Sequence, residues 1–247
     1  MELRKQIEIE YYDKRAQDSE GDFEGFNSRD LGSFRFCYEL LEKYCKDKII
    51  LDYGCGNGVH AEFLARTGAK KVIGIDLSGK SLEIARKRES RVKFLKMDCE
   101  KMDFPEGYFD VIFDGQTFSS LDLRLAYPEL ARVLKPEGVL IGIETFGHNP
   151  IANLKRKINK MTGKRTTWAA EHIFQMKDLA EAEKYFNKIK TYFFHPISCL
   201  AFPFLNLPGG KILLKFLEKV DKFFLYFSFL RKYAFKVVFI FHGKKII

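Results

Sequence analysis

The chain has 247 residues, 46% of them hydrophobic, with 42 basic against 33 acidic residues and a formal net charge of +9. This length suits one sizeable α/β domain with an inserted or appended cap, and the hydrophobic content is ample for a buried core. Five cysteines without a Cys-x-x-Cys pair exclude a disulfide framework and a zinc site, while the charge excess favours an anionic partner or surface.

The first 44 residues are predicted to be N-terminal helices that form a lid. They are polar at the start, carry the pair Tyr11-Tyr12 and contain no apolar signal region, so we expect a cytoplasmic protein. The acidic, glycine-containing residues 18–25 predict a loop. Apolar side chains at helical spacing then predict a helix over 31–44 that leads into the first strand.

The stretch from 49 to 78 predicts a nucleoside site. An apolar strand over 49–51 runs into a turn with three alternate glycines (54–58), and a helix follows. A second strand over 72–75 ends on Asp76. Glycines let the backbone turn sharply and approach a ligand closely, and an acid at the end of the second strand is placed to accept both hydroxyls of a ribose. The alternative is a chance glycine turn between a strand and a helix.

Asp52 narrows the choice of nucleotide. A carboxylate two residues before Gly54 would repel a pyrophosphate, and it suits a cationic ligand such as the ammonium or sulfonium of S-adenosylmethionine. Val59 follows Gly58, so the third glycine of the dinucleotide fingerprint is missing. Both features favour S-adenosylmethionine over a dinucleotide.

Strands and helices then alternate up to residue 146. The predicted elements are a helix from Ser78 to Arg88, a strand over 92–97, a strand over 109–114, a helix over 123–134 and a strand over 139–144. This alternation indicates a parallel, doubly wound sheet whose ligands bind beyond the carboxyl ends of the strands.

The pattern changes after residue 146. A basic segment over 155–165 is followed by predicted elements: a helix over 176–186, a strand over 190–194, a helix over 211–233 and a strand over 235–241. The uncharged run 191–210 has the length of a membrane span, but its three prolines and its Gly-Gly pair argue against a spanning helix. It is interpreted as a strand followed by irregular apolar chain.

Together these motifs resemble the class I S-adenosylmethionine-dependent methyltransferases, in the broad group that includes quinone-ring and small-molecule methyltransferases. The matching stretches are 51–58 (Leu-Asp-Tyr-Gly-Cys-Gly-Asn-Gly), 74–78 (Gly-Ile-Asp-Leu-Ser), 97–99 (Met-Asp-Cys), 109–113 (Phe-Asp-Val-Ile-Phe) and 131–138 (Ala-Arg-Val-Leu-Lys-Pro-Glu-Gly). The resemblance implies a Rossmann-like, seven-stranded α/β sheet with the last strand antiparallel.

The resemblance also implies a single domain of four parts with a helical cap. These parts are an N-terminal lid (1–44), a cofactor-binding core (45–146), a substrate-side insertion (147–187) and terminal strands with a helical insertion (188–247). The cap would consist of the N-terminal segment and residues after 146.

On the methionine side, the resemblance implies that Gly54, Cys55 and Gly56 hold the methionine part of S-adenosylmethionine, with Gly54 accepting from its ammonium. Asp52 lies next to this turn. Asp76 is implied to bind the ribose hydroxyls.

On the adenine side, Leu77 is implied to pack on the ring and Asp98 to accept from its amino group, with Cys99 beside it. Asp114 stands where the fourth strand meets the cofactor, and Tyr12 belongs to a Tyr-Tyr-Asp segment that closes over it. The alternatives are that the tyrosines pack the first helix, that Asp98 caps a turn and that Asp114 is a solvated acid.

Methyl transfer needs a general base only where the nucleophile must lose a proton. Relatives often carry a His pair after the fourth strand, where this chain has Ser119-Ser120, and serines are poor bases at neutral pH. The candidate catalytic residues are therefore Glu144, His148 and His172. The alternative is that His148 shapes a turn and Glu171 caps a helix. No residue spacing suggests a metal.

The expected function is methyl transfer from S-adenosylmethionine to a small or lipid-linked acceptor, most simply at oxygen. The basic segment 155–165 favours an anionic acceptor, unless it is a solvated helix face. The Phe-rich segment 211–233 is either the core of the cap or a peripheral contact at the inner membrane face. Nucleic acid is not expected as a partner. The alternatives are another enzyme on this cofactor fold, an aminopropyl transferase or a dehydrogenase, or a membrane-recruited adaptor without catalysis.

Overall fold

The structure is a computed structural model that describes residues 2–18, 30–161 and 165–245. The loop predicted over 18–25 therefore lies outside the described residues from position 19 onward. The basic segment predicted over 155–165 is described except for residues 162–164 and the side chain at 155.

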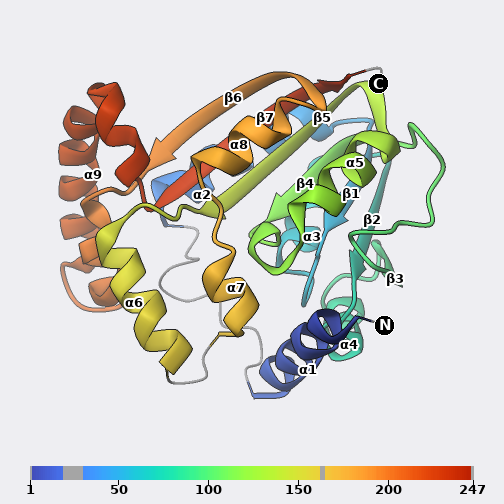
Figure 1. Cartoon of the computed structure of the whole chain (residues 1–247), viewed down its shortest axis with the longest axis horizontal. Coiled ribbons are helices and arrows are strands. Elements are labelled where there is room, and N and C mark those ends of the chain that lie inside the picture. Colours follow the sequence, from blue (N-terminus) through green and yellow to red (C-terminus); the bar gives the residue numbers. More distant parts are fainter. Residues whose placement is uncertain (1, 19–29, 162–164, 246–247) are drawn as a thin grey trace.

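Seven strands form one sheet in the order β3-β2-β1-β4-β5-β7-β6 (Figure 1). Their bounds are β1 Ile49–Tyr53, β2 Lys71–Asp76, β3 Lys93–Lys96, β4 Phe109–Gly115, β5 Leu134–Thr145, β6 Phe186–Phe194 and β7 Lys236–Lys244. β7 runs antiparallel to both of its neighbours, and the other pairings are parallel. The predicted Rossmann-like sheet with an antiparallel last strand is confirmed.

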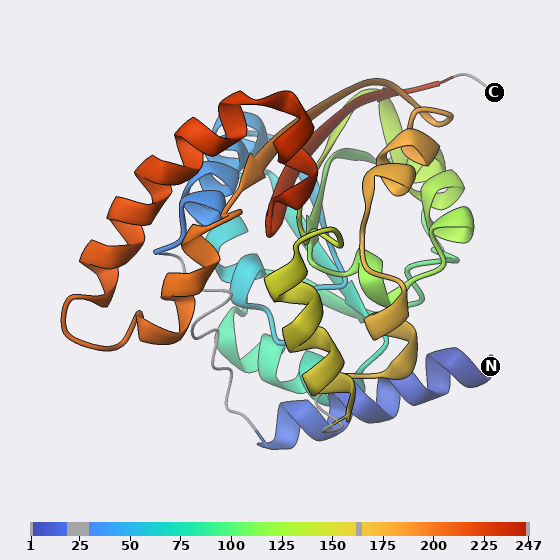
Figure 2. The ribbon, with the colours of Figure 1, turned by 60° about the vertical axis from the view of Figure 1, so that its left-hand side comes forward.

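Helices cover both faces of the sheet, as Figures 1 and 2 show. The helices are α1 Leu3–Asp18, α2 Gly32–Cys45, α3 Val59–Leu64, α4 Gly79–Arg88, α5 Leu123–Val133, α6 Pro150–Met161, α7 Thr167–Glu171, α8 Met176–Ala182 and α9 Gly210–Tyr226, and the short 3₁₀ turns are η2 Phe118–Ser120, η3 Ser198–Phe204 and η4 Ser228–Tyr233. One core lies between the sheet and α2, α3 and α4, and the other lies between the sheet and α5 and α8.

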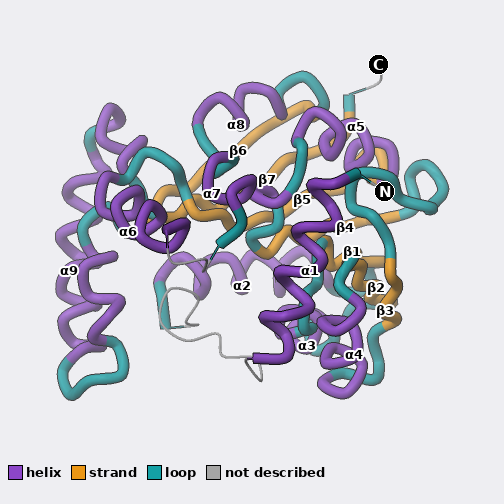
Figure 3. The backbone as a smooth tube through the Cα atoms, turned by 60° about the horizontal axis from the view of Figure 1, so that its bottom comes forward, coloured by secondary structure: helices purple, strands orange, loops and turns teal. Residues whose placement is uncertain are grey.

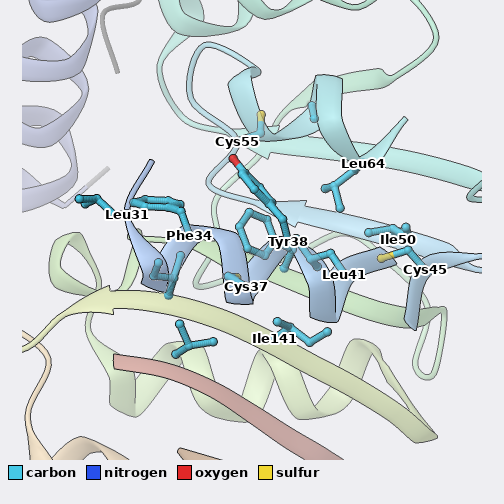
Figure 4. Packing of buried hydrophobic residues seen from close by; sticks show 14 of the residues in the cluster. Leu31, Phe34, Cys37, Tyr38, Leu41, Cys45, Ile50, Cys55, Leu64 and Ile141 are labelled. Atoms are coloured by element: carbon cyan, nitrogen blue, oxygen red, sulfur yellow. The ribbon is translucent and has the colours of Figure 1, made fainter. Parts of the chain in front are cut away.

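The packing of α2 on the sheet follows from the spacing of the apolar residues in this helix. Phe34, Tyr38 and Leu41 recur at helical spacing and are buried against Ile50 and Ile141 of the sheet (Figure 4). Because adjacent side chains of a strand point to opposite faces, the central strands are apolar on both sides, as in parallel sheets covered by helices.

The structure corrects several predicted elements. The helix predicted over 176–186 ends at Ala182, and the strand predicted over 139–144 extends from Leu134 to Thr145. The helix predicted over 211–233 is divided, because Phe227 adopts an extended conformation after α9 and its ring packs on Phe223 and Tyr226. The strand predicted over 190–194 is longer and begins at Phe186, because β7 pairs with it along its whole length. Among the described residues, no helix has the length and apolarity that crossing a bilayer requires.

Two helices from distant parts of the chain lie beyond the carboxyl ends of the parallel strands. α1 contacts α4, where Asp13 accepts from the Ser78 hydroxyl and from the Lys80 amide. α7 packs against η2, and the guanidinium of Arg4 lies 4.7 Å from the ring centroid of Trp168. The edge of the sheet that carries the predicted site is therefore covered by α1 and α7 (Figure 1).

Candidate functional site

The turn between β1 and α3 is shaped by three glycines, all with left-handed φ angles of 65°, 51° and 79°. A Cβ on Gly54 would come within 2.3 Å of Thr117 Oγ1, and one on Gly58 within 2.9 Å of Ala85 Cβ. A Cβ on Gly56 would meet nothing within 4 Å. Packing therefore requires the outer two glycines, and the middle one faces open space that a ligand can occupy.

Asp76 joins this turn to the end of β2. Its Oδ2 accepts from the Gly56 amide at 2.9 Å, and its Oδ1 accepts from the Ser78 amide at 2.8 Å. Each carboxylate oxygen keeps a lone pair for a further donor. Burial raises the pKa of Asp76 against the effect of these amides, and Leu77 follows it, half-buried.

Asp52 and Asp114 are buried at the ends of neighbouring strands. Each has an Oδ2 atom with no hydrogen-bond partner among the described residues. Burial and the charge of Asp76 raise the pKa of Asp52 to about 8. Burial and the charge of Glu144 raise the pKa of Asp114 well above its ordinary value. Because an unpaired buried carboxylate is costly, a cationic ligand beside Gly56 would stabilise this edge.

The carboxylate predicted on the adenine side is engaged by α1. Asp98 Oδ1 accepts from the Glu100 amide at 2.9 Å, and its Oδ2 pairs with Lys5 Nζ at 2.6 Å. Cys99 is buried next to it, and its carbonyl accepts from the Tyr53 hydroxyl at 2.9 Å. A ligand amine at Asp98 would therefore share this carboxylate with Lys5 or displace it.

The serine pair after β4 connects the covering helices to the sheet. The Tyr12 hydroxyl lies 3.2 Å from Ser120 Oγ, and Arg165 donates to Ser119 Oγ at 2.7 Å. Where relatives of the resembled group carry histidines, these serines hold α1 and the segment after α6 in place.

Glu144 ends β5 in a buried position. Its Oε1 accepts from the Phe118 amide at 2.7 Å and its Oε2 from the Thr145 amide at 3.3 Å. Burial raises its pKa to about 7, partly offset by these amides and by the charges of Lys236 and Arg165. Near neutral pH this carboxylate can therefore both accept and release a proton.

Sequence analysis missed Lys236. It is the first residue of β7, and because β7 is antiparallel its start lies at the carboxyl edge of the parallel strands, opposite Thr145. The side chain is fully buried, donates to Gln116 Oε1, and has its pKa lowered by burial to about 7. The only sequence signal is a lysine within the otherwise apolar run 235–241.

Two arginines join Lys236 and Glu144 at this edge. Arg156 is 8% exposed and donates to the Phe146 carbonyl at 2.8 Å. Burial and the charge of Arg165 lower its pKa to about 10, and the charges of both arginines lower the pKa of Lys236. None of the three forms an ion pair with a carboxylate of the described residues. Arg156, Arg165 and Lys236 are called the cation cluster below.

The two candidate histidines lie in different environments. His148 is half-buried, its Nε2 has no hydrogen-bond partner among the described residues, and burial and the charge of Lys232 lower its pKa. His172 is exposed, and its ring stacks on Trp168 with the centroids 3.6 Å apart. Within the described ranges no group of His, Cys, Asp or Glu is arranged to hold a metal ion.

Residues 51–142 match the model of the methyltransferase domain family. Among curated relatives, the ribosomal protein L11 methyltransferase of Paraburkholderia phymatum is 33% identical over 126 residues, which is 50% of this chain and 41% of that protein. The chain thus spans less than half the length of the curated relatives it matches, 34–41% in the first three.

Two solved structures share the fold over almost the whole chain. Haemonchus contortus phosphoethanolamine N-methyltransferase 2, in complex with phosphomonomethylethanolamine and S-adenosylhomocysteine, has a TM-score of 0.66 and 17% identity and covers 99% of this chain, which spans 61% of that one. Geranyl diphosphate C-methyltransferase of Streptomyces coelicolor, in complex with Mg²⁺, geranyl diphosphate and S-adenosylhomocysteine, has a TM-score of 0.64 and 14% identity, with 99% of this chain and 98% of that one covered. Residues 51–142 therefore match the methyltransferase domain family, and almost the whole chain shares the fold of these two methyltransferases.

Proposed function

We propose that this protein transfers the methyl group of S-adenosylmethionine to an oxygen of a small or lipid-linked acceptor. The observation that carries the proposal is the buried Oδ2 atom of Asp52, which has no hydrogen-bond partner among the described residues and belongs to the strand that leads into the glycine turn. A ligand that brings an ammonium and a sulfonium supplies positive charge beside this carboxylate.

The proposed cofactor contacts follow the order of the strands. The turn of Gly54, Cys55 and Gly56 surrounds the methionine part, with Asp52 facing its ammonium. Asp76 keeps lone pairs for the ribose hydroxyls.

The remaining contacts lie on the other side of the ribose. Leu77, Asp98 and Cys99 flank the adenine there. Two proposed contacts lie elsewhere: Asp114 at the methionine end, and Tyr12, which covers the cofactor from α1.

When bound, the cofactor supplies a methyl group that is already activated for in-line displacement. The protein's contribution is to hold the acceptor oxygen in line and to exclude water, and such orientation is worth about 7 kcal/mol or more. The helices α1 and α7 cover the edge where this takes place. An acceptor hydroxyl must also lose its proton, which requires a base at the same edge.

Glu144 is the proposed base. Its pKa of about 7 matches proton transfer near neutral pH, and its two amide contacts fix its orientation. His148, with a free Nε2 and a pKa lowered by burial, is the second candidate. His172, which is exposed, is the third.

The cation cluster supports an anionic acceptor. Two buried cations and one half-buried cation gather beside Glu144 without ion pairs among the described residues, so an anionic group would compensate their charge. Two structural relatives are in complex with phosphorylated molecules, geranyl diphosphate and phosphomonomethylethanolamine. We therefore propose that the acceptor carries a phosphate, diphosphate or similar anionic group.

Inorganic pyrophosphate is a probe for this anionic group. We expect a saturating concentration to raise the melting temperature of the S-adenosylhomocysteine-bound protein by about 2–4 °C, because only the folded protein holds the cluster together. Lys236→Met should abolish this shift, whereas Lys93→Met on the exposed face of β3 should retain it. Equal shifts in the two variants would contradict the role of Lys236.

Cofactor binding should depend on pH through Asp52. Below about pH 8 Asp52 is protonated in the free protein, and the ligand ammonium favours its ionised form, so affinity for S-adenosylhomocysteine should rise up to tenfold per pH unit from about pH 6 to 8. Isothermal titration measures this, and Asp52→Asn should weaken binding and flatten the profile. A flat wild-type profile would contradict the role of Asp52.

The same titration separates the alternative functions. Binding of a dinucleotide in place of S-adenosylmethionine and its product would favour a dehydrogenase, and binding of decarboxylated S-adenosylmethionine would favour an aminopropyl transferase. An adaptor would bind vesicles through residues 211–233 and transfer no methyl group to any lipid extract. An enzyme that acts on a lipid-linked acceptor would bind vesicles and also transfer the methyl group, with residues 211–233 as its peripheral contact with the membrane.

A further inference from the structure

η3, α9 and η4 lie together at one end of the molecule (Figure 2), and many of their large apolar side chains are exposed. Phe223 is 73% exposed and Tyr226 is 79% exposed. The exposed large apolar residues of this region are Leu200, Phe204, Leu207, Ile212, Leu213, Phe216, Phe223, Tyr226, Phe227, Phe229 and Tyr233, and together they are called the outer apolar face. Contiguous exposed apolar patches of this kind mark interaction sites.

The inner side of α9 is held in place by its two acids. Glu218 accepts from the Gly32 amide at 2.8 Å and pairs with Arg35 at 3.0 Å. Asp221 is buried and accepts from the amides of Ile197 and Ser198. The orientation of α9 is therefore fixed by several contacts, and its exposed apolar residues, such as Phe216 and Phe223, face outward as part of the folded structure.

With its acids turned inward, the outward side of this region carries only positive charge. Residues 200–233 contain six basic and two acidic residues, and the two acids are Glu218 and Asp221. Lys211 pairs with Asp30 at 2.9 Å. The other five, which form no ion pair with the described residues, are exposed: Lys215, Lys219, Lys222, Arg231 and Lys232.

A separate stripe of apolar side chains lies on α6. Ile151, Leu154, Ile158 and Met161 recur at spacings of three and four residues and are all exposed, whereas Arg156 is buried on the other side. α6 lies at the same end of the molecule as α9 (Figures 1 and 3).

Asn149 joins the two regions. Its side chain donates to the carbonyl of Tyr233 at 2.8 Å and to that of Pro196 at 3.1 Å, and it accepts from the Ala152 amide in the first turn of α6. The start of α6 is therefore fixed to the end of η4.

We propose that the outer apolar face and the stripe on α6 form a docking surface for an anionic lipid bilayer. Aromatic and aliphatic side chains with interspersed lysines are what a helix lying in an anionic lipid interface requires. In a symmetric dimer through this surface, the same lysines would face each other without acids to neutralise them, so a second copy fits less well.

The docking surface also bears on the acceptor, an inference that rests on the proposed function. The helix that carries the apolar stripe also carries Arg156 of the cation cluster on its buried side. A lipid-linked acceptor could therefore remain in the bilayer while its anionic headgroup reaches the cluster beside Glu144.

Vesicle sedimentation with the full chain tests the surface. We expect binding to phosphatidylcholine vesicles that contain about 30% phosphatidylglycerol, weaker binding in high salt, and little binding to phosphatidylcholine alone. Lys219→Gln with Lys222→Gln should weaken binding about thirtyfold, at about fivefold per lysine. Phe223→Ser with Tyr226→Ser should weaken it at least about tenfold, because apolar insertion is lost.

Matched controls lie elsewhere on the surface. Leu125→Ser removes an exposed apolar residue from α5, and Lys93→Gln removes an exposed lysine from β3, so both should bind vesicles like the wild type. All variants should keep their affinity for S-adenosylhomocysteine, so a failure of the surface is distinguishable from a failure of the proposed function. Wild-type protein that ignores anionic vesicles, or forms dimers that Phe223→Ser with Tyr226→Ser dissociates, would overturn the proposal.

Discussion

Asp76→Ala is expected to lower the affinity for S-adenosylhomocysteine at least about a hundredfold. Two hydrogen bonds from ribose hydroxyls to a charged carboxylate are worth about 1.5–3 kcal/mol each. The substitution also removes the acceptor that holds the Gly56 amide, so the turn that surrounds the methionine part loses its anchor. Isothermal titration measures the loss, and circular dichroism checks that the fold is retained.

Two further variants make this result specific. Asp76→Asn keeps the size and one acceptor oxygen, so it should lose less affinity than the alanine variant. Asp103→Ala removes an exposed carboxylate from a loop and should bind like the wild type. A folded Asp76→Ala protein with unchanged affinity would show that ribose does not bind at the end of β2.

Glu144→Gln is expected to lower kcat by a factor of about 10²–10⁴, the usual contribution of a general base, while leaving affinity for S-adenosylhomocysteine unchanged. Glutamine can still accept from the Phe118 amide, so the local structure should persist. The assay is transfer of labelled methyl groups into a total lipid extract. Wild-type activity should rise with pH and level off above about pH 7, where Glu144 is ionised.

The pH dependence of the free energy of unfolding is a second test of the raised pKa of Glu144. Its folded pKa lies above its ordinary value of 4.5, so the folded protein holds a proton that the unfolded chain releases. Its contribution to stability is therefore complete below about pH 4.5 and is lost as the pH rises through about 7. Glu144→Gln, which stays neutral, should unfold with a weaker dependence on pH over this range.

If Glu144 is not the base, variants of His148 and His172 test whether a histidine takes the proton. Glu137→Gln, on an exposed turn, is the matched control and should be fully active. Should Glu144→Gln turn over at the wild-type rate, His148→Ala and His172→Ala identify whether either histidine takes the proton. Loss of activity in His148→Ala alone would move the base to the start of α6.

The sequence by itself determined the cofactor half of the protein. The glycine turn, the strand that ends on Asp76 and the alternation of strands and helices are local signals, because each depends on the backbone freedom or the periodicity of a few neighbouring residues. The sheet with an antiparallel last strand is confirmed, and residues 51–142 match the methyltransferase domain family. The roles of individual residues, including Asp98 and Asp114, stay predictions.

Only the tertiary structure decided the acceptor side. Lys236 lies beside Glu144 because an antiparallel strand returns its start to the carboxyl edge, a contact between residues 92 positions apart that no local pattern encodes. The inward position of Glu218 on α9 likewise depends on a distant partner, the Gly32 amide. Local periodicity predicts which segments are helical, but the partners that a helix meets determine which of its faces is buried.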